Sequence, residues 1–250
     1  MIKSQFTLCA ALFLSCSLLA KDNVPPPESI RPEPLKEEWA VGWWMPRHEQ
    51  ILKRMAKGNV DLLMIGDSIT HWWEKFGKKR PAGPLVWAEY YAKRNAVNLG
   101  FAGDRTENVL WRLQNGEVQG ISPRLAVLLI GTNNAEHRQE DPQATALGIQ
   151  TIISELRTRL PATKVLLLAI FPRGAAENDA LRQLNTRTNT IIAKFADDKT
   201  VFFLDINRKF MGENGQLPRN IMPDFLHPNE NGYRLWAEAM EPTIRKLMGE

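Results

Sequence analysis

The chain has 250 residues, of which 44% are apolar and 24% charged, a balance typical of globular rather than disordered proteins. Its 32 basic and 28 acidic residues give a formal net charge of +4. The basic residues are scattered, and their only run of three is at residues 78–80. The sequence therefore lacks the basic stripe that neutralises phosphates, and we expect no nucleic-acid partner.

The first 20 residues have the pattern of a secretory signal. Lys3 precedes an apolar run over residues 6–19, and Ala20 supplies a small residue at the expected cleavage point. The run is shorter than the roughly 20 residues of a membrane-spanning helix. We expect an exported protein, cleaved after Ala20, with no membrane span in the mature chain. The alternative is a lipoprotein signal at Cys16, a pattern that residues 13–15 fit poorly.

Both cysteines, Cys9 and Cys16, lie within this signal segment. A chain cleaved after residue 20 would contain no thiol, which excludes disulfides, thiolate metal sites and a cysteine nucleophile. Residues 21–38 are rich in proline and charge, a composition that predicts an extended tether. The remaining residues, 39–250, are expected to form one domain large enough to bury its own core.

Five short apolar runs predict strands that are buried on both faces, at residues 60–65, 96–99, 125–130, 165–171 and 201–206. Amphipathic stretches between and after them predict helices, notably at residues 142–160, 179–195 and 229–248. This alternation predicts an α/β fold with a five-stranded parallel sheet and helices on both faces. Ligands bind such sheets outside the carboxyl ends of the strands. The residues that follow each strand are therefore the candidates for a site.

The first predicted strand is followed by Gly66-Asp67-Ser68. Ser68 would stand at a strand-to-helix turn, where free backbone N–H groups and the helix dipole favour a developing negative charge. The pattern differs from the G-x-S-x-G elbow of the α/β-hydrolases. On its own it fits an ordinary helix cap better than it fits a nucleophile.

Candidate hydrogen-bond donors follow the next two predicted strands. Gly103 could present its backbone N–H to an oxyanion, and Asn133, in Gly-Thr-Asn-Asn, could donate from its side-chain amide. Each segment alone also fits an ordinary turn. Three candidate donors after three consecutive strands, with the Ser68 N–H as the third, favour an anion-stabilising site.

Near the C-terminus, Asp224 lies three residues before His227. Across a turn, this spacing lets the carboxylate accept from Nδ1–H of the imidazole and leaves Nε2 free to face a hydroxyl. Among the four histidines, only His227 combines a nearby acid with a turn into the last predicted helix. We expect His71 and His137 to be rim or structural residues, and we assign His48 no chemical role.

These motifs, in this order, resemble the SGNH (GDSL-type) hydrolase superfamily. The resemblance is closer to the catalytic subunits of platelet-activating-factor acetylhydrolase and covers most of residues 40–245, through WWMPRHEQIL, VDLLMIGDSIT, NLGFAGDRTENVLWRLQNGE, GTNN, FPRG and DFLHPNENGY. It implies a three-layer, flavodoxin-like fold and a serine esterase that uses neither a metal nor another cofactor.

Position by position, the resemblance implies that Ser68 is the nucleophile, His227 the base and Asp224 the acid that orients it. It implies an oxyanion hole formed by the Ser68 and Gly103 N–H groups and the Asn133 side-chain amide. The chain would thus hold a complete Ser-His-Asp triad.

The resemblance also implies a short acyl pocket, formed by Ile69, Thr132 and Leu226, which suits acetyl or similarly short groups. Asn134 stands where aspartate is commoner in the superfamily, although the closer subfamily shares the GTNN form. Arg105 replaces a smaller residue of that subfamily, which leaves the leaving-group preference open. The resembling subunits can dimerise, so a homodimer is also open.

Two tryptophan pairs, Trp43-Trp44 and Trp72-Trp73, bear on the substrate. The second pair follows Ser68 closely and could stack on a sugar ring, although core packing is the alternative for both pairs. With export, this favours removal of acetyl groups from a small or polymeric carbohydrate. The other hypotheses are an acetylhydrolase of phospholipid-like or small esters, and a non-catalytic exported binding module on the same fold.

Overall fold

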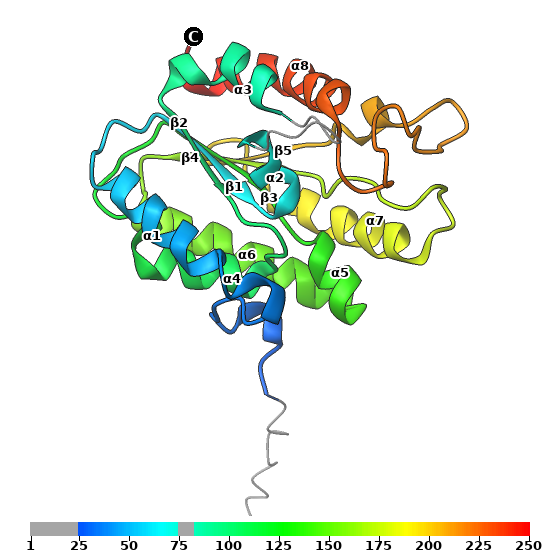
Figure 1. Cartoon of the computed structure of the whole chain (residues 1–250), viewed down its shortest axis with the longest axis horizontal. Helices are drawn as coiled ribbons and strands as arrows, with labels where there is room; N and C mark the ends of the chain where they lie inside the picture. The colour runs from blue at the N-terminus through cyan, green and yellow to red at the C-terminus, as the bar shows by residue number, and fades with distance from the viewer. Residues whose placement is uncertain (1–24, 75–82) are drawn as a thin grey trace, which may run out of the picture.

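The computed structural model describes residues 25–74 and 83–250. Its centre is a parallel sheet with strand order β2-β1-β3-β4-β5 (Figure 1). The α/β fold with a five-stranded parallel sheet is therefore confirmed. The strands are β1 (Leu62–Gly66), β2 (Ala96–Gly100), β3 (Leu125–Leu129), β4 (Lys164–Leu168) and β5 (Val201–Leu204).

Helices cover both faces of this sheet and complete the three layers. In Figure 1, α3 and α8 lie on one side, while α1, α4, α5, α6 and α7 lie on the other. The α-helices are α1 (Trp44–Met55), α2 (Ser68–His71), α3 (Pro84–Tyr90), α4 (Thr106–Arg112), α5 (Thr132–Arg138), α6 (Pro142–Arg159), α7 (Ala180–Ile192) and α8 (Glu230–Met248). Shorter helical turns are η1 (Glu28–Ile30), η2 (Glu38–Ala40), η3 (Trp72–Glu74), η4 (Ala92–Arg94), η5 (Leu113–Glu117), η6 (Ala193–Phe195) and η7 (Asn207–Phe210).

Each strand has apolar side chains on both faces because each face meets a helix layer. In β1, Leu63 and Ile65 pack with the core beneath α1, α4 and α6, whereas Leu62 and Met64 pack with the core beneath α3 and α8. This explains why the strands read as nearly continuous apolar runs rather than as alternating patterns.

The direction in which successive strands are added to the parallel sheet reverses at β1. From β1 the chain crosses to β2 on one side and then returns to β3 on the other. A crevice forms at such a switch point, outside the carboxyl ends of the strands. The loops after β2, β1 and β3 therefore meet at one edge of the sheet.

The described part of the expected tether, residues 25–38, is packed on the domain. The Ser29 hydroxyl donates to the Ala144 carbonyl at 2.8 Å, and the Ser29 carbonyl accepts from the Thr106 hydroxyl at 2.9 Å. Leu35 is buried in the core beneath α4 and α6. The expected boundary at residue 39 is therefore corrected, since buried polar and apolar contacts extend the domain toward the N-terminus.

The predicted signal at residues 1–20 and the first four residues of the predicted tether lie outside the described residues. Within residues 25–74 and 83–250, no helix has the length and apolar character needed to cross a bilayer.

If residues 25–42 belong to the folded domain, their removal must cost stability. Compared with a chain that begins at residue 25, a chain that begins at residue 43 should lose at least about 2 kcal/mol of unfolding free energy, the worth of burying a side chain such as Leu35. Urea unfolding of the two chains measures the difference. Equal midpoints and slopes would show that the segment adds nothing to the fold.

Candidate active site

Ser68 lies at the carboxyl edge of the sheet because β1 ends two residues before it and α2 begins with it. The Asp67 carboxylate caps α2 by accepting the Ile69 N–H at 2.9 Å. Helix α2 can pass across the end of β2 because Gly100 has no side chain: a Cβ there would lie 2.1 Å from the His71 nitrogen. The strand-to-helix turn thereby fixes the Ser68 hydroxyl at the predicted edge.

The serine, histidine and aspartate predicted as a triad form one hydrogen-bonded relay. The Ser68 Oγ lies 2.9 Å from His227 Nε2, and His227 Nδ1 lies 3.0 Å from Asp224 Oδ2. The second Asp224 oxygen accepts the backbone N–H groups of His227 at 2.8 Å and Leu226 at 3.2 Å. This turn holds Phe225 at a φ of 59°, an uncommon conformation for an aromatic residue that is often found where function requires it.

The Asp224 carboxylate stays ionised in this setting. Burial by itself would raise the pKa of Asp224, but the hydrogen bonds from the side chain and backbone of His227 and its charge lower that pKa overall. An ionised acid holds Nδ1 protonated and leaves Nε2 with its lone pair toward the Ser68 hydroxyl.

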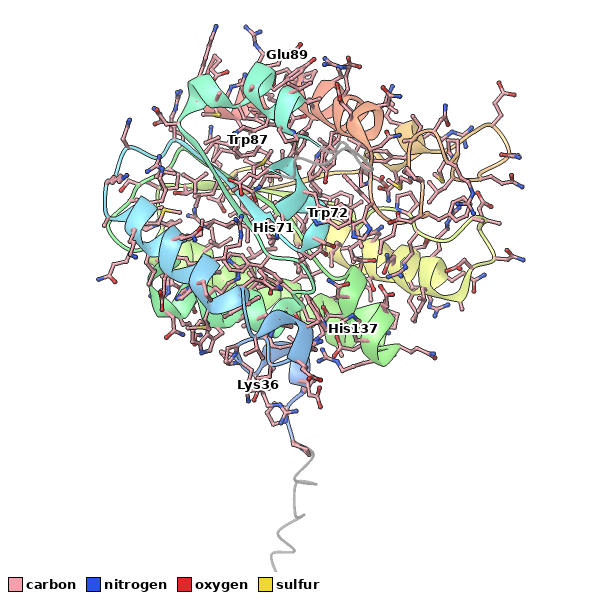
Figure 2. All side chains as sticks on the ribbon, viewed as in Figure 1. Lys36, His71, Trp72, Trp87, Glu89 and His137 are labelled. Atoms are coloured by element: carbon pink, nitrogen blue, oxygen red, sulfur yellow. The ribbon has the colours of Figure 1, made fainter. Side chains whose placement is uncertain are left out.

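Two contacts hold His227 against α2. Tyr233 of α8 donates its hydroxyl to the Ile69 carbonyl at 2.6 Å, which ties the helix after His227 to the helix of Ser68. Trp72 stacks on the imidazole, with ring centroids 3.9 Å apart and planes 22° apart. Figure 2 shows Trp72 and His71 where α2 ends, between the two helix layers. The sequence motifs did not reveal either contact.

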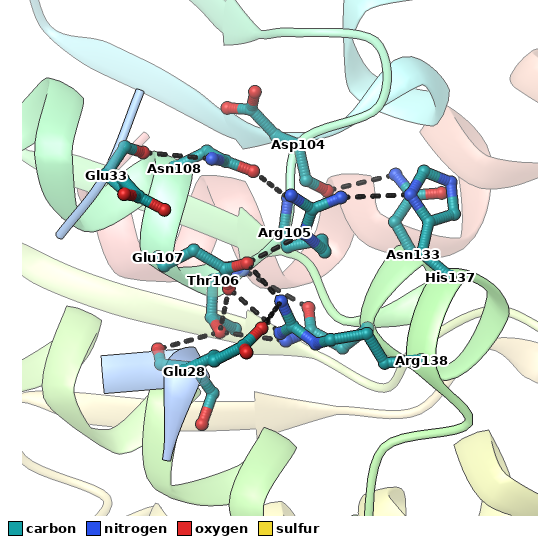
Figure 3. Close-up of polar contacts among 12 residues, drawn as sticks. Glu28, Glu33, Asp104, Arg105, Thr106, Glu107, Asn108, Asn133, His137 and Arg138 are labelled. Atoms are coloured by element: carbon teal, nitrogen blue, oxygen red, sulfur yellow. Dashed lines mark hydrogen bonds and ion pairs between the residues drawn. The ribbon is translucent and has the colours of Figure 1, made fainter. Parts of the chain in front are cut away.

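Three donor groups follow β1, β2 and β3. The Asn133 side-chain amide donates to the Asp104 carbonyl at 2.9 Å, which places it against the loop that contains Gly103 (Figure 3). One hydrogen of that amide remains for a second acceptor. The Ser68 and Gly103 N–H groups have no acceptor among the described residues. Gly103 adopts a φ of 82°, which favours glycine.

A buried charged cluster fixes the loop that bears these donors. The Arg112 Nε lies 2.8 Å from Asp104 Oδ2, the Trp44 indole donates to Asp104 Oδ1 at 2.7 Å, and Arg112 also pairs with Glu117. The Arg112, Asp104 and Glu117 side chains are all fully buried. His48 contacts Glu117 through Nδ1 at 2.8 Å, so it completes this cluster rather than the catalytic relay.

The three residues predicted to form the acyl pocket have different surroundings in the structure. Ile69 and Leu226, each next to a relay residue, belong to the same apolar cluster. The Thr132 hydroxyl instead accepts from Arg173 at 3.1 Å and from Asn185 at 3.2 Å. Thr132 therefore also anchors the start of α5, just before Asn133.

The other motif residues are structural or lie at the rim. Asn134 is buried and donates to Thr106 and Glu140. Arg105 pairs with Glu107 and contacts His137, as Figure 3 shows. These contacts hold the Arg105 side chain along the rim rather than leaving it free in the site.

The two members of each tryptophan pair differ in burial. Trp73 is fully buried against Tyr233 and Trp236, and Trp44 is buried beside Asp104. Trp72 and Trp43 are only partly buried. One member of each pair therefore packs in the core, and the other lies at the surface.

Among the residues that the structure describes, no group of three or more histidine, cysteine, aspartate or glutamate side chains is arranged to hold a metal ion. The arrangement can perform acyl transfer, since a hydroxyl, a base, an orienting acid and amide donors lie together.

A Ser-His-Asp relay beside amide donors, at the carboxyl edge of a flavodoxin-like sheet, defines a serine hydrolase of the SGNH type. The sequence model of the GDSL-like Lipase/Acylhydrolase family matches residues 64–235, and the chain belongs to this family. The resemblance found in the motifs is thus confirmed, and the protein is a carboxylic ester hydrolase.

Individual relatives agree with this membership. The chain is 32% identical over 208 residues to platelet-activating factor acetylhydrolase IB subunit alpha2 of Rattus norvegicus, covering 83% of this chain and 86% of the relative. The structure resembles a GDSL-like lipase from Bacteroides thetaiotaomicron (TM-score 0.63, 18% identity, 80% of this chain and 97% of the other). It also resembles Axe2, an acetylxylan esterase from Geobacillus stearothermophilus (TM-score 0.58, 17% identity, 77% and 95%). These two structures share the fold.

The Asn133 amide should matter for turnover and not for folding. Replacing it with alanine removes one candidate oxyanion donor, so kcat should fall roughly 10²- to 10³-fold. Steady-state hydrolysis of 4-nitrophenyl acetate measures the loss, and an unchanged circular dichroism spectrum shows that the protein remains folded. A variant with near wild-type kcat would contradict the assignment of this donor.

The Asp67 carboxyl should make stability depend on pH. Burial raises the pKa of Asp67 to about 7, with the Ile69 hydrogen bond opposing the shift. Between about pH 4 and pH 7 the folded state holds a proton that the unfolded chain has released. The free energy of unfolding therefore falls as the pH rises from about 4, and this contribution is lost once the pH has passed about 7.

We therefore expect the unfolding free energy of the wild type to fall more between pH 5 and pH 8 than that of Asp67→Asn. Asparagine keeps the acceptor for the Ile69 N–H and cannot titrate, so the difference between the two proteins isolates this carboxyl. Urea unfolding at both pH values tests it. The same pH dependence in both proteins would mean that Asp67 does not titrate in this range.

Proposed function

We propose that this protein is an exported serine esterase that removes short acyl groups, above all acetyl groups, from carbohydrates. The observation that carries the proposal is the 2.9 Å contact between Ser68 Oγ and His227 Nε2, with Asp224 behind the imidazole. Export is supported by the secretory pattern of the first 20 residues.

In the first step, Ser68 Oγ attacks the ester carbonyl carbon while His227 Nε2 takes its proton. The carbonyl oxygen becomes negative and accepts from the Ser68 and Gly103 N–H groups and the Asn133 amide. The imidazolium, stabilised by Asp224, then gives its proton to the departing alcohol oxygen as the carbon–oxygen bond breaks.

In the second step, a water molecule attacks the acyl-serine carbonyl and His227 takes its proton. The same three donors stabilise the second oxyanion. The bond to Ser68 Oγ breaks, the serine regains its proton, and the free acid leaves. Every bond change uses groups of this chain and water.

Different observations support the two parts of the proposed substrate, the short acyl group and the carbohydrate. Ile69 and Leu226, beside the nucleophile and the base, offer apolar contacts for a small acyl group. The shared fold with an acetylxylan esterase and the partly buried Trp72 beside His227 favour a sugar.

The second candidate is an acetylhydrolase of phospholipid-like or small esters, and the identity to the acetylhydrolase subunit favours it. A non-catalytic binding module is disfavoured because every position of the relay is filled and within hydrogen-bond distance.

A fluorophosphonate should label the wild type covalently and should not label Ser68→Ala, because the adduct forms on the activated hydroxyl. Labelling of Ser68→Ala would overturn the nucleophile assignment.

Acetate release from acetylated xylo-oligosaccharides should exceed that from a short-chain 2-acetyl phospholipid at equal concentration, measured by coupled acetate assay. Preference for the phospholipid would favour the second candidate.

A further inference from the structure

The N-terminal segment, residues 28–43, reaches the candidate oxyanion loop. The edge of the Trp39 indole lies directly over Gly103: a Cβ on that glycine would meet Trp39 Cη2 at 2.4 Å. Trp39 lies at this edge, yet it is 54% exposed, the third-highest exposure among the large apolar residues that the described part of the structure leaves at the surface. A tryptophan placed beside a reaction centre with a free face is suited to bind a ligand.

Trp39 forms one wall of a cleft of about 310 Å³ next to the relay. Trp39 stacks on Trp43 with centroids 6.0 Å apart, and Trp43 packs on His71 at 5.5 Å. The cleft is lined by Trp39, Trp43, His71, Trp72, Glu74 and Ala102. Its walls are therefore mostly aromatic, with one carboxylate.

The cleft adjoins the catalytic relay through Trp72 and the candidate oxyanion loop through Ala102. His227 must reach the leaving oxygen to protonate it, and Trp72 both covers the His227 ring and lines the cleft. At the other end, Ala102 adjoins Gly103, the candidate oxyanion donor. An alcohol portion bound in this cleft would therefore lie beside both the base and the donor loop.

The segment that bears Trp39 is fixed to the domain by polar contacts and by a buried side chain. Glu37 accepts from Arg105 Nη1 at 2.6 Å. The Glu33 carbonyl accepts from the Asn108 side chain at 2.9 Å, as Figure 3 shows. Leu35 between them is buried. Arg105 thereby helps to fix the segment that bears Trp39.

We propose that this cleft is the subsite for the leaving group, in which Trp39 and Trp43 bind the sugar ring that bears the ester. This inference rests on the proposed function. Apolar C–H faces of a pyranose stack on indole rings, and sugar hydroxyls bind charged groups at the edge. Glu74, paired with Arg47 at 2.9 Å, places both a carboxylate and a guanidinium at that edge.

The geometry favours a sugar over a quaternary ammonium headgroup. Recognition of such a cation uses aromatic faces from several directions around it. Here the planes of the Trp39, Trp43 and His71 rings are only 27° and 33° apart in succession, so the rings face a ligand from similar directions and do not surround it. The Glu74 charge is also already compensated by Arg47.

The test compares Trp39→Ala and Trp43→Ala with Val41→Ala, a matched control. Val41 belongs to the same segment and is 68% exposed, but it does not line the cleft. For each protein, kcat/KM is measured for acetylated xylo-oligosaccharide and for methyl acetate. The ratio of the two constants should fall about 10- to 100-fold in both tryptophan variants and stay unchanged in the control. Trp39→Phe, which keeps an aromatic face, should restore most of the ratio.

A second measurement does not depend on turnover. Xylotriose without acetyl groups should bind Ser68→Ala in calorimetry, and Ser68→Ala combined with Trp39→Ala should bind it at least about tenfold more weakly. A wild type with no preference for the sugar ester, or variants with unchanged ratio and affinity, would overturn the inference. Tighter binding of phosphocholine than of xylotriose would do the same. If neither the acetylated xylo-oligosaccharide nor methyl acetate is hydrolysed, the proposed function fails while the binding result still decides the subsite.

Discussion

The contact between Ser68 Oγ and His227 Nε2 is the interaction on which the account of this protein depends. It joins residues 159 positions apart at 2.9 Å, and neither its length nor its direction follows from either residue alone. The parallel sheet sets the position of Ser68, since β1 ends two residues before α2 begins. Helix α8 sets the position of His227, since Tyr233 binds α2 directly at the Ile69 carbonyl. The core beneath α3 and α8 thus positions the base relative to the nucleophile.

The donor side of the site depends on a different part of the molecule. Asp104 has two separate roles there: its carbonyl accepts the Asn133 amide, and its carboxylate pairs with Arg112. Removal of one partner from a buried ion pair leaves an uncompensated charge and typically costs about 3–5 kcal/mol. The loop with Gly103 is therefore fixed by charge pairing in the core beneath α1 and α4. Relay and donors meet only where the two helix layers meet the sheet edge.

The sequence was sufficient to predict the strands and the longer helices, and its resemblance to a hydrolase superfamily implied the residues of the relay. These features have local signals: apolar runs, helix caps such as Asp141, and polar residues placed directly after strands. The features it did not predict arise from contacts between distant segments. Trp39 over Gly103 is one, and the pairing of Arg112 with Asp104 and Glu117 is another. Composition also misled: residues 25–38 look like a solvated tether, yet they pack on the domain because a few buried positions outweigh their many prolines and charges.

The central claim is that the relay and the three donors act on one carbonyl group. A crystal structure of the protein after reaction with a small alkyl fluorophosphonate tests it most directly, because the tetrahedral phosphorus mimics the intermediate. The account predicts phosphorus bonded to Ser68 Oγ and a phosphonyl oxygen within about 3.1 Å of the Ser68 and Gly103 nitrogens and of Asn133 Nδ2. An adduct on another residue, or a phosphonyl oxygen turned toward solvent and away from Gly103 and Asn133, would contradict it.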